Sequence, residues 1–129
     1  MDDRMMKNWL YGLARKAGFR RNQIKSEIVV TFPDGSQIRP DVGIYDRHGR
    51  LLIALEGFRT SAVSRRKKQL SRKYGFQIFE FCVGDSRRHV YQRKILAKEF
   101  LEWVKRKRQQ NPERPLWIPP EKSKIYRVQ

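Results

Sequence analysis

Apolar residues recur at helical spacing in three parts of the chain. The first pattern predicts an amphipathic helix over residues 2–16, whose core face is formed by Met5, Met6, Trp9, Leu10 and Leu13. A narrower apolar stripe predicts a second helix over residues 61–74, with Ser61 as its N-cap and Gly75 at its end. A third helix is expected to begin after Asp85 or Ser86 and to reach about Gln110.

Shorter apolar stretches predict strands between these helices. Residues 27–32 read as a first strand, and residues 42–45 and 51–55 as two strands joined by the polar turn 46–50, which is typical of a hairpin. The nearly continuous apolar segment 76–83 predicts a buried fourth strand. Because a helix separates it from the third strand, we expect these two strands to be parallel.

These elements give the order αβββαβα, and they predict an α/β fold with a mixed sheet whose central hairpin is flanked by helices. A chain of 129 residues suffices for one domain, which we place at residues 1–110. The tail at residues 111–129 contains several prolines and apolar residues without periodicity. We expect it to pack on the domain or on a partner chain.

The hairpin brings two carboxylates together. Antiparallel pairing about a turn near His48 and Gly49 sets Asp41 opposite Glu56, and opposed side chains lie on the same face of a sheet, about 5 Å apart. Two such carboxylates repel each other at a strand end. A divalent cation would remove that repulsion, and Mg²⁺ is commonly held by one or two carboxylates.

The sequence Arg-Pro-Asp-Val at residues 39–42, followed by a hairpin and an apolar strand ending in Glu56, resembles the PD-(D/E)XK nuclease superfamily, the restriction-endonuclease-like fold. The resemblance covers roughly residues 5–84. It implies that Asp41 and Glu56 are catalytic metal ligands and that the carbonyl of Gly57 adds a further ligand. It also makes Glu27 a candidate third acid; the alternative is that Glu27 is an ordinary surface carboxylate. Glu80, inside the last strand, is either an edge residue or an additional acid of the site.

One position departs from that family pattern, which places a lysine two residues after the acid, where this chain has Phe58. Three interpretations are open. A cation from elsewhere replaces the lysine: Arg39, which the hairpin register sets opposite Phe58, or a residue of the following loop or helix, namely Arg59, Lys67 or Lys68. Alternatively, the protein binds metal and DNA without cutting, or the resemblance is accidental.

Gln69 is a further candidate in the predicted second helix. With Leu70 beside it and Tyr74 beyond, it resembles the Gln-Leu…Tyr feature of RecB-type nucleases, in which the glutamine lies near the active site; here the tyrosine is one residue further away than in that pattern. The alternative is a surface glutamine on a basic helix.

Positive charge dominates the composition. Thirty Lys and Arg against 13 Asp and Glu give a formal net charge of +17, which favours polyanionic partners. The clearest nucleic-acid-binding candidates follow Glu56, and most have no acidic partner within their own helix: Arg59, Arg65, Arg66, Lys67, Lys68, Arg72 and Lys73.

Together these features predict a Mg²⁺-dependent DNA endonuclease, with Mn²⁺ as a substitute metal and no small-molecule cofactor. We expect it to act as a homodimer, because a duplex has two strands to cut. The alternatives are a non-catalytic DNA-binding protein on a degenerate fold of this family and a basic adaptor for an acidic protein. No apolar run approaches 18 residues, and Cys82 is the only cysteine, so we expect a cytoplasmic protein that does not enter membranes.

Overall fold

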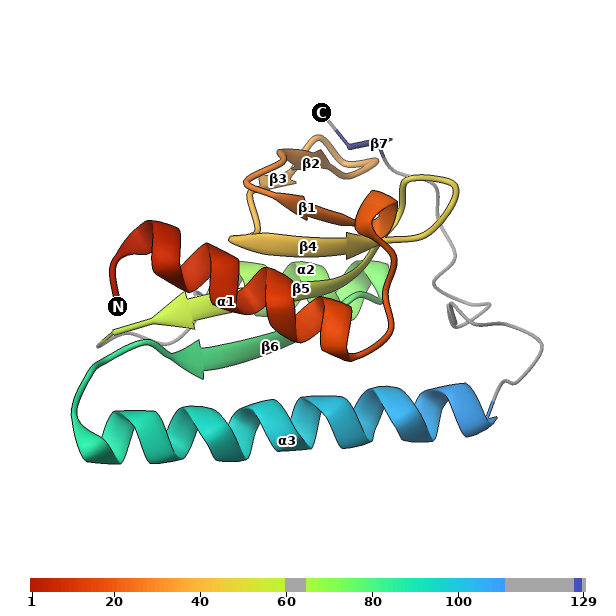
Figure 1. The fold of residues 1–129 in the computed structure, drawn as a ribbon. Coiled ribbons are helices and arrows are strands. Elements are labelled where there is room, and N and C mark those ends of the chain that lie inside the picture. Colours follow the sequence, from red (N-terminus) through yellow and green to blue (C-terminus); the bar gives the residue numbers. More distant parts are fainter. Residues whose placement is uncertain (60–64, 111–126, 129) are drawn as a thin grey trace.

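The computed structural model describes residues 1–59, 65–110 and 127–128. It is a mixed α/β structure in which helices cover both faces of a four-stranded sheet (Figure 1). The helices are α1 (Asp3–Lys16), α2 (Arg65–Tyr74) and α3 (Arg87–Gln110), with a short 3₁₀ helix, η1 (Arg21–Gln23). Among the residues described, no helix is both long and apolar enough to cross a lipid bilayer.

The main sheet has the strand order β1-β4-β5-β6. Its strands are β1 (Ile24–Ser26), β4 (Val42–Tyr45), β5 (Leu51–Phe58) and β6 (Gln77–Cys82). The first three are antiparallel neighbours, whereas β5 and β6 are parallel, as predicted from the helix between them. The sheet is therefore mixed, with the predicted hairpin at its centre.

A second, smaller sheet lies beside the main one. It has the order β3-β2-β7 and consists of β2 (Val30–Thr31), β3 (Gln37–Ile38) and β7 (Arg127–Val128), all antiparallel. The backbone of residues 127–128 thus pairs with β2. Residues 111–126, which make up most of the predicted tail, lie outside the described residues.

The two faces of the main sheet have separate apolar cores. On one face α1 and α3 pack on the sheet, with Leu10, Phe81 and Phe100 fully buried. On the other face α2 and the β2–β3 hairpin enclose a smaller core around Tyr45, Tyr74 and Phe76. In Figure 1 α1 lies in front of the sheet, α2 lies behind it and α3 runs along β6.

The predicted helices are confirmed where the structure describes them. Asp2 caps α1 by accepting a hydrogen bond from the Met5 N–H, and Ser86 caps α3 by accepting one from the His89 N–H. The predicted start of the second helix, residues 61–64, lies outside the described residues, and α2 is described from Arg65.

The predicted first strand is wrong. Residues 27–32 do not form one strand of the main sheet; that place is taken by β1, and only Val30–Thr31 is a strand, in the second sheet. The break is at Glu27, which has a φ of 52° and so lies in the left-handed region that strands exclude. Its N–H donates to the carbonyls of Pro40 and Asp41, so the chain turns away from the sheet at this point.

Candidate functional site

Asp41 and Glu56 lie on neighbouring strands at one end of the main sheet. The β4–β5 register pairs Val42 with Leu55, and one further step along it sets Asp41 opposite Glu56. Two hydrogen bonds join the strands here: the Asp41 N–H donates to Glu56 Oε2 at 3.2 Å, and the Gly57 N–H donates to Asp41 Oδ2 at 2.9 Å. The predicted placement of the two carboxylates is confirmed, and each also binds the partner strand's backbone.

Glu56 is the more deeply buried of the two acids. Its residue is 4% exposed, because α2 covers the end of β5 on which it lies. Burial raises the pKa of Glu56 to about 7, and the negative charge of Asp41 acts in the same direction, whereas the bond from Lys67 opposes the rise. The pair therefore includes one carboxyl whose charge is costly unless a cation compensates it.

Lys67 provides such a cation from α2. Its Nζ lies 2.7 Å from Glu56 Oε1. Lys67 is on the helix face that turns toward the sheet, together with the buried Leu70 and Tyr74, because residues three, four and seven apart share one face of a helix. Of the cations considered as replacements for the missing lysine, Lys67 is the one that the structure places on the carboxylates. Position 58 is part of β5 instead, where Phe58 pairs with Cys82.

A third acid lies next to Glu56 on the other side. Glu80 of β6 is its direct neighbour in the parallel register, and Lys68 Nζ approaches Glu80 Oε1 at 3.9 Å. Two consecutive lysines of α2, Lys67 and Lys68, thus face two acids that lie side by side on β5 and β6. The sequence singled out Glu80 as an acid in an apolar strand, but only the register shows that it adjoins Glu56.

Tyr45, at the other end of β4, was not anticipated to interact with Glu56. Its buried hydroxyl has no hydrogen-bond partner among the described residues, and burial together with the charge of Glu56 raises the pKa of Tyr45. The ring passes so close to Gly43 that a Cβ there would lie 2.5 Å from the hydroxyl oxygen. A glycine inside an apolar strand is the sequence signal for this close approach.

Two predicted side chains are not placed with the pair. Glu27 follows β1, and its carboxylate lies 2.8 Å from Lys7 Nζ on α1. Arg39 was expected opposite Phe58; the ladder between β4 and β5 ends at Val42 and Leu55, and Arg39 precedes β4 as an exposed residue, so its placement opposite Phe58 stays a prediction. Beyond Val42 the strands are joined through the two carboxylates rather than through a continued ladder.

Gln69 and Arg59 are also outside the pair's immediate surroundings. Gln69 is exposed on α2 and lies off the face that carries Lys67 and Leu70. Arg59 follows β5, is exposed, and donates a hydrogen bond to the carbonyl of Met1.

The basic surface of α2 divides into two groups. Three of its lysines are paired with acids of other elements: Lys67 with Glu56, Lys68 with Glu80 and Lys73 with Asp34. Its arginines are exposed and have no acidic partner among the described residues; they are Arg65, Arg66 and Arg72. The sequence-based statement that these cations have no acidic partner within their own helix is confirmed, because α2 contains no acid; the lysines find their partners on other elements.

The donor set suits one hard divalent cation. Asp41 and Glu56 supply carboxylate oxygens. The N–H of Gly57 faces Asp41. Because the N–H and the carbonyl of a strand residue point to the same neighbouring strand, the Gly57 carbonyl faces this side too. Mg²⁺ is usually held by few protein oxygens, with water and phosphate completing its shell. In the described ranges no three or more His, Cys, Asp or Glu side chains converge on one point, so Glu27 does not join the pair.

Comparisons with protein-family models, with curated proteins and with solved structures found no match to this chain.

Proposed function

We propose that this protein is a Mg²⁺-dependent endonuclease that hydrolyses phosphodiester bonds of DNA. The observation that carries the proposal is the ion pair at 2.7 Å between Lys67 and Glu56, next to Asp41. Two carboxylates and a lysine are the groups that the resemblance to PD-(D/E)XK nucleases requires. The lysine reaches them from α2 instead of from position 58.

The element order supports the same proposal. Taken with the helices, the strands of the main sheet follow one another as α1, β1, β4, β5, α2, β6 and α3. This is the αβββαβα order that the resemblance implies, with β2 and β3 inserted after the first strand. The carboxylates lie at the start of β4 and near the end of β5, in the central hairpin of that order.

Each residue has a distinct role in this proposal. Asp41, Glu56 and the Gly57 carbonyl would hold the divalent cation, which when bound polarises the phosphate and lowers the pKa of a water. The Lys67 ammonium would orient the attacking water and stabilise the negative charge that develops on the phosphate oxygens. Because a lysine is a compact point charge with rotatable donors, it can leave Glu56 and turn toward a phosphate.

The unpaired arginines of α2 indicate where the DNA backbone would lie. Arg65, Arg66 and Arg72 are exposed on the helix that carries Lys67. Arginine binds phosphate through a planar fork of donors, and this affinity is independent of sequence. A homodimer would present two such sites to the two strands of a duplex.

The test is cleavage of a panel of duplex, branched and single-stranded DNAs with Mg²⁺ or Mn²⁺. We expect Asp41→Asn, Glu56→Gln and Lys67→Met each to lower the rate by about 100-fold or more, the scale reported for the loss of one transition-state donor. DNA binding in EDTA should change by no more than about threefold, since each variant alters one charge. Lys98→Met, on the exposed side of α3, is the matched control and should cut normally.

A second variant tests the lysine replacement itself. Phe58 lies two residues beyond Glu56 on β5 and therefore on the same face, and it is only half-buried. Adding Phe58→Lys to the Lys67→Met protein should restore at least about tenfold of the lost rate, because a lysine stem can cover apolar surface while its charge reaches the site. A folded double variant without recovery would show that Lys67 acts in another way.

The second candidate function is a DNA-binding protein without nuclease activity. It is favoured by one observation: Glu56 already has an ion-pair partner in Lys67, so its charge is balanced within the protein. If no DNA is cut with either metal, and binding is unaffected by Asp41→Asn and Glu56→Gln, this second function replaces the first.

A further inference from the structure

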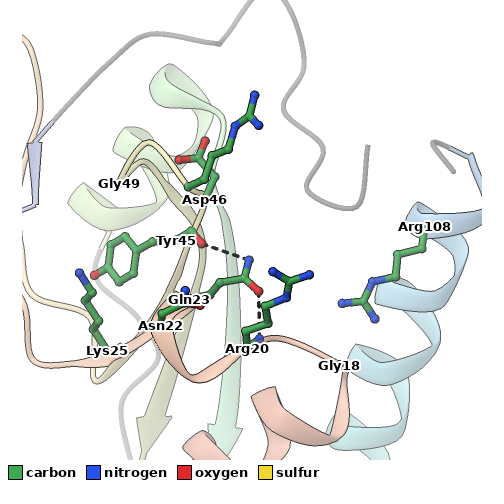
Figure 2. A pocket seen from close by; sticks show the side chains of 10 residues that line it. Gly18, Arg20, Asn22, Gln23, Lys25, Tyr45, Asp46, Gly49 and Arg108 are labelled. Atoms are coloured by element: carbon green, nitrogen blue, oxygen red, sulfur yellow. Dashed lines mark hydrogen bonds between the residues drawn. The ribbon is translucent and has the colours of Figure 1, made fainter. Parts of the chain in front are cut away.

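A polar pocket lies at the opposite end of the main sheet from Asp41 and Glu56. It has a volume of about 560 Å³ and is formed by the end of α1, η1, β1, the β4–β5 turn and the end of α3 (Figure 2). This is within the size range of small-ligand sites. Asp41 precedes the four residues of β4 and Asp46 follows them, so five steps along the strand, roughly 17 Å, separate these two residues.

Four cations line this pocket. Arg20, Lys25 and Arg47 are exposed at their positions, and Arg108 reaches in from α3. Figure 2 shows the guanidinium groups of Arg20 and Arg108 pointing toward one another. In the part of the chain that the structure describes, none of the four forms an ion pair with an acid. Like charges gathered in this way repel one another unless an anion lies between them.

Asp46 is the one acid among the described residues that line the pocket, and it does not neutralise these cations. The Asp46 carboxylate is 5% exposed and already accepts three hydrogen bonds, from the His48 N–H, the Arg50 N–H and the Arg50 Nε, all between 2.8 and 3.0 Å. It shapes the β4–β5 turn as the fixed acceptor of these donors. Its charge is balanced by Arg50, so no acid of the described ranges compensates the four cations.

The pocket is held in shape before any ligand arrives. Gln23 accepts from the Arg20 N–H at 2.9 Å and donates to the Tyr45 carbonyl at 3.4 Å, which ties η1 to β4 (Figure 2). Arg108 donates to the carbonyl of Ala17 and stacks 4.8 Å above the ring of Phe19. Burial lowers the pKa of Arg108, which means that its charge is poorly solvated where it lies.

We propose that this pocket binds a phosphate group. This anion site is separate from the carboxylate pair, which would hold a cation. Three arginines and a lysine around one polar cavity match the charge and the several acceptor oxygens of phosphate better than a single carboxylate, because each guanidinium can donate two parallel bonds. The phosphate is supplied by a nucleic-acid strand or by a free nucleotide. The proposal does not rest on nuclease activity, since binding can be measured without a divalent cation.

The experiment compares two triple variants in EDTA. The pocket variant combines Arg20→Gln, Lys25→Gln and Arg47→Gln, and the control combines Arg87→Gln, Arg88→Gln and Lys98→Gln on the exposed side of α3; both lose three charges. Anisotropy measures binding to duplex DNA, and calorimetry measures binding to inorganic phosphate and to AMP. We expect the pocket variant to bind at least tenfold more weakly than the control variant. A loss of DNA binding identifies a nucleic-acid strand as the source of the phosphate, and a loss of AMP binding identifies a free nucleotide.

A measurement on the unmodified protein guards against misfolding of the variant. Titration with inorganic phosphate, followed by the backbone amide resonances, should give saturable shifts at Asn22 and Gly49 in the pocket and none at Gly57 beside the carboxylates. Equal DNA, phosphate and AMP binding in both triple variants, or phosphate shifts spread evenly over the surface, would overturn the proposal. Neither result depends on whether Asp41 and Glu56 support cleavage.

Discussion

Single residues of the candidate site combine burial with charge, and Glu56 shows this most clearly. Its carboxylate is almost fully enclosed, yet it accepts bonds from Lys67 and from the Asp41 backbone. A buried acid with such partners can ionise, but at a cost that an unfolded chain does not bear. That cost should be visible in the pH dependence of stability.

We expect Glu56→Gln to change this pH dependence in one direction. Burial raises the Glu56 pKa from 4.5 to about 7, so between these values the folded protein holds a proton that the unfolded chain has released. The wild type therefore loses stability as pH rises through this window, by about 2–3 kcal/mol at 1.36 kcal/mol per unit. Urea unfolding at pH 5 and pH 8 should show that loss reduced by a similar amount in Glu56→Gln. The same loss in both proteins would mean that Glu56 titrates normally.

At Tyr45 we expect a substitution that does not destabilise the fold. In the part of the chain that the structure describes, its buried hydroxyl has no hydrogen-bond partner, which is unfavourable by about 1–3 kcal/mol. Tyr45→Phe should leave the free energy of unfolding unchanged or raise it by about 1 kcal/mol, whereas Gly43→Ala should lower it because the added methyl meets the ring. Thermal and urea unfolding of the two variants measure both effects; a clearly destabilised Tyr45→Phe would reveal a hydrogen bond made by the hydroxyl.

At the scale of elements, the hairpin and the helices were predictable, and the first strand was not. The β4–β5 hairpin follows from local signals, two short apolar strands and a polar turn with Gly49, which has a φ of 79°. Residues 27–32 carry a similar apolar signal, but the left-handed Glu27 divides them from β1. That conformation is fixed by bonds to Pro40 and Asp41, so it depends on contacts distant in sequence.

The partners of α2 show the same difference between local and distant information. The amphipathic pattern predicted the helix and its basic character, and it left Arg59, Lys67 and Lys68 as candidates for one role. Only the packing of α2 on the sheet decides that Lys67 meets Glu56 and Lys68 meets Glu80. The acids of a neighbouring strand cannot be read from the helix itself.

The junction between β6 and α3 carries a stability prediction. Arg93 is buried and donates to the carbonyls of Cys82 and Gly84 at 2.9 and 3.0 Å, with its guanidinium 5.8 Å from the Trp9 ring. Arg93→Met would leave both carbonyls without this donor, at a cost of about 1.5–3 kcal/mol, the range for a hydrogen bond to a charged group. Urea unfolding measures the change. Lys94→Met, its exposed neighbour on α3, should alter stability by less than about 0.5 kcal/mol.

For the whole molecule, the excess of positive charge should determine how binding responds to salt. Three arginines of α2 are exposed without acidic partners among the described residues, whereas its lysines Lys67, Lys68 and Lys73 are paired. Within α2, the charge available to a polyanion is therefore carried by its arginines.

We expect the triple variant Arg65→Gln, Arg66→Gln and Arg72→Gln to reduce the salt dependence of DNA binding. Each lost phosphate contact lowers the slope of log K against log salt by about 0.9, so the slope should fall by about 2–3. Binding titrations at several salt concentrations in EDTA measure it. The triple Gln variant at Arg87, Arg88 and Lys98 removes the same charge from α3, and an equal fall there would mean that DNA does not lie along α2.

The ion pair between Lys67 and Glu56 has a consequence for the concentration of metal at which the site would work. The protein carries its own counterion on the acid that the proposed cation needs, so the two compete for one carboxylate. The ammonium is tethered, and a dissolved ion must displace it by offering a second charge. The Mg²⁺ concentration needed to occupy the site would then depend on how strongly Lys67 holds Glu56. Replacing Lys67 would let the site bind Mg²⁺ at a lower concentration, but it would also remove the group that acts on the phosphate.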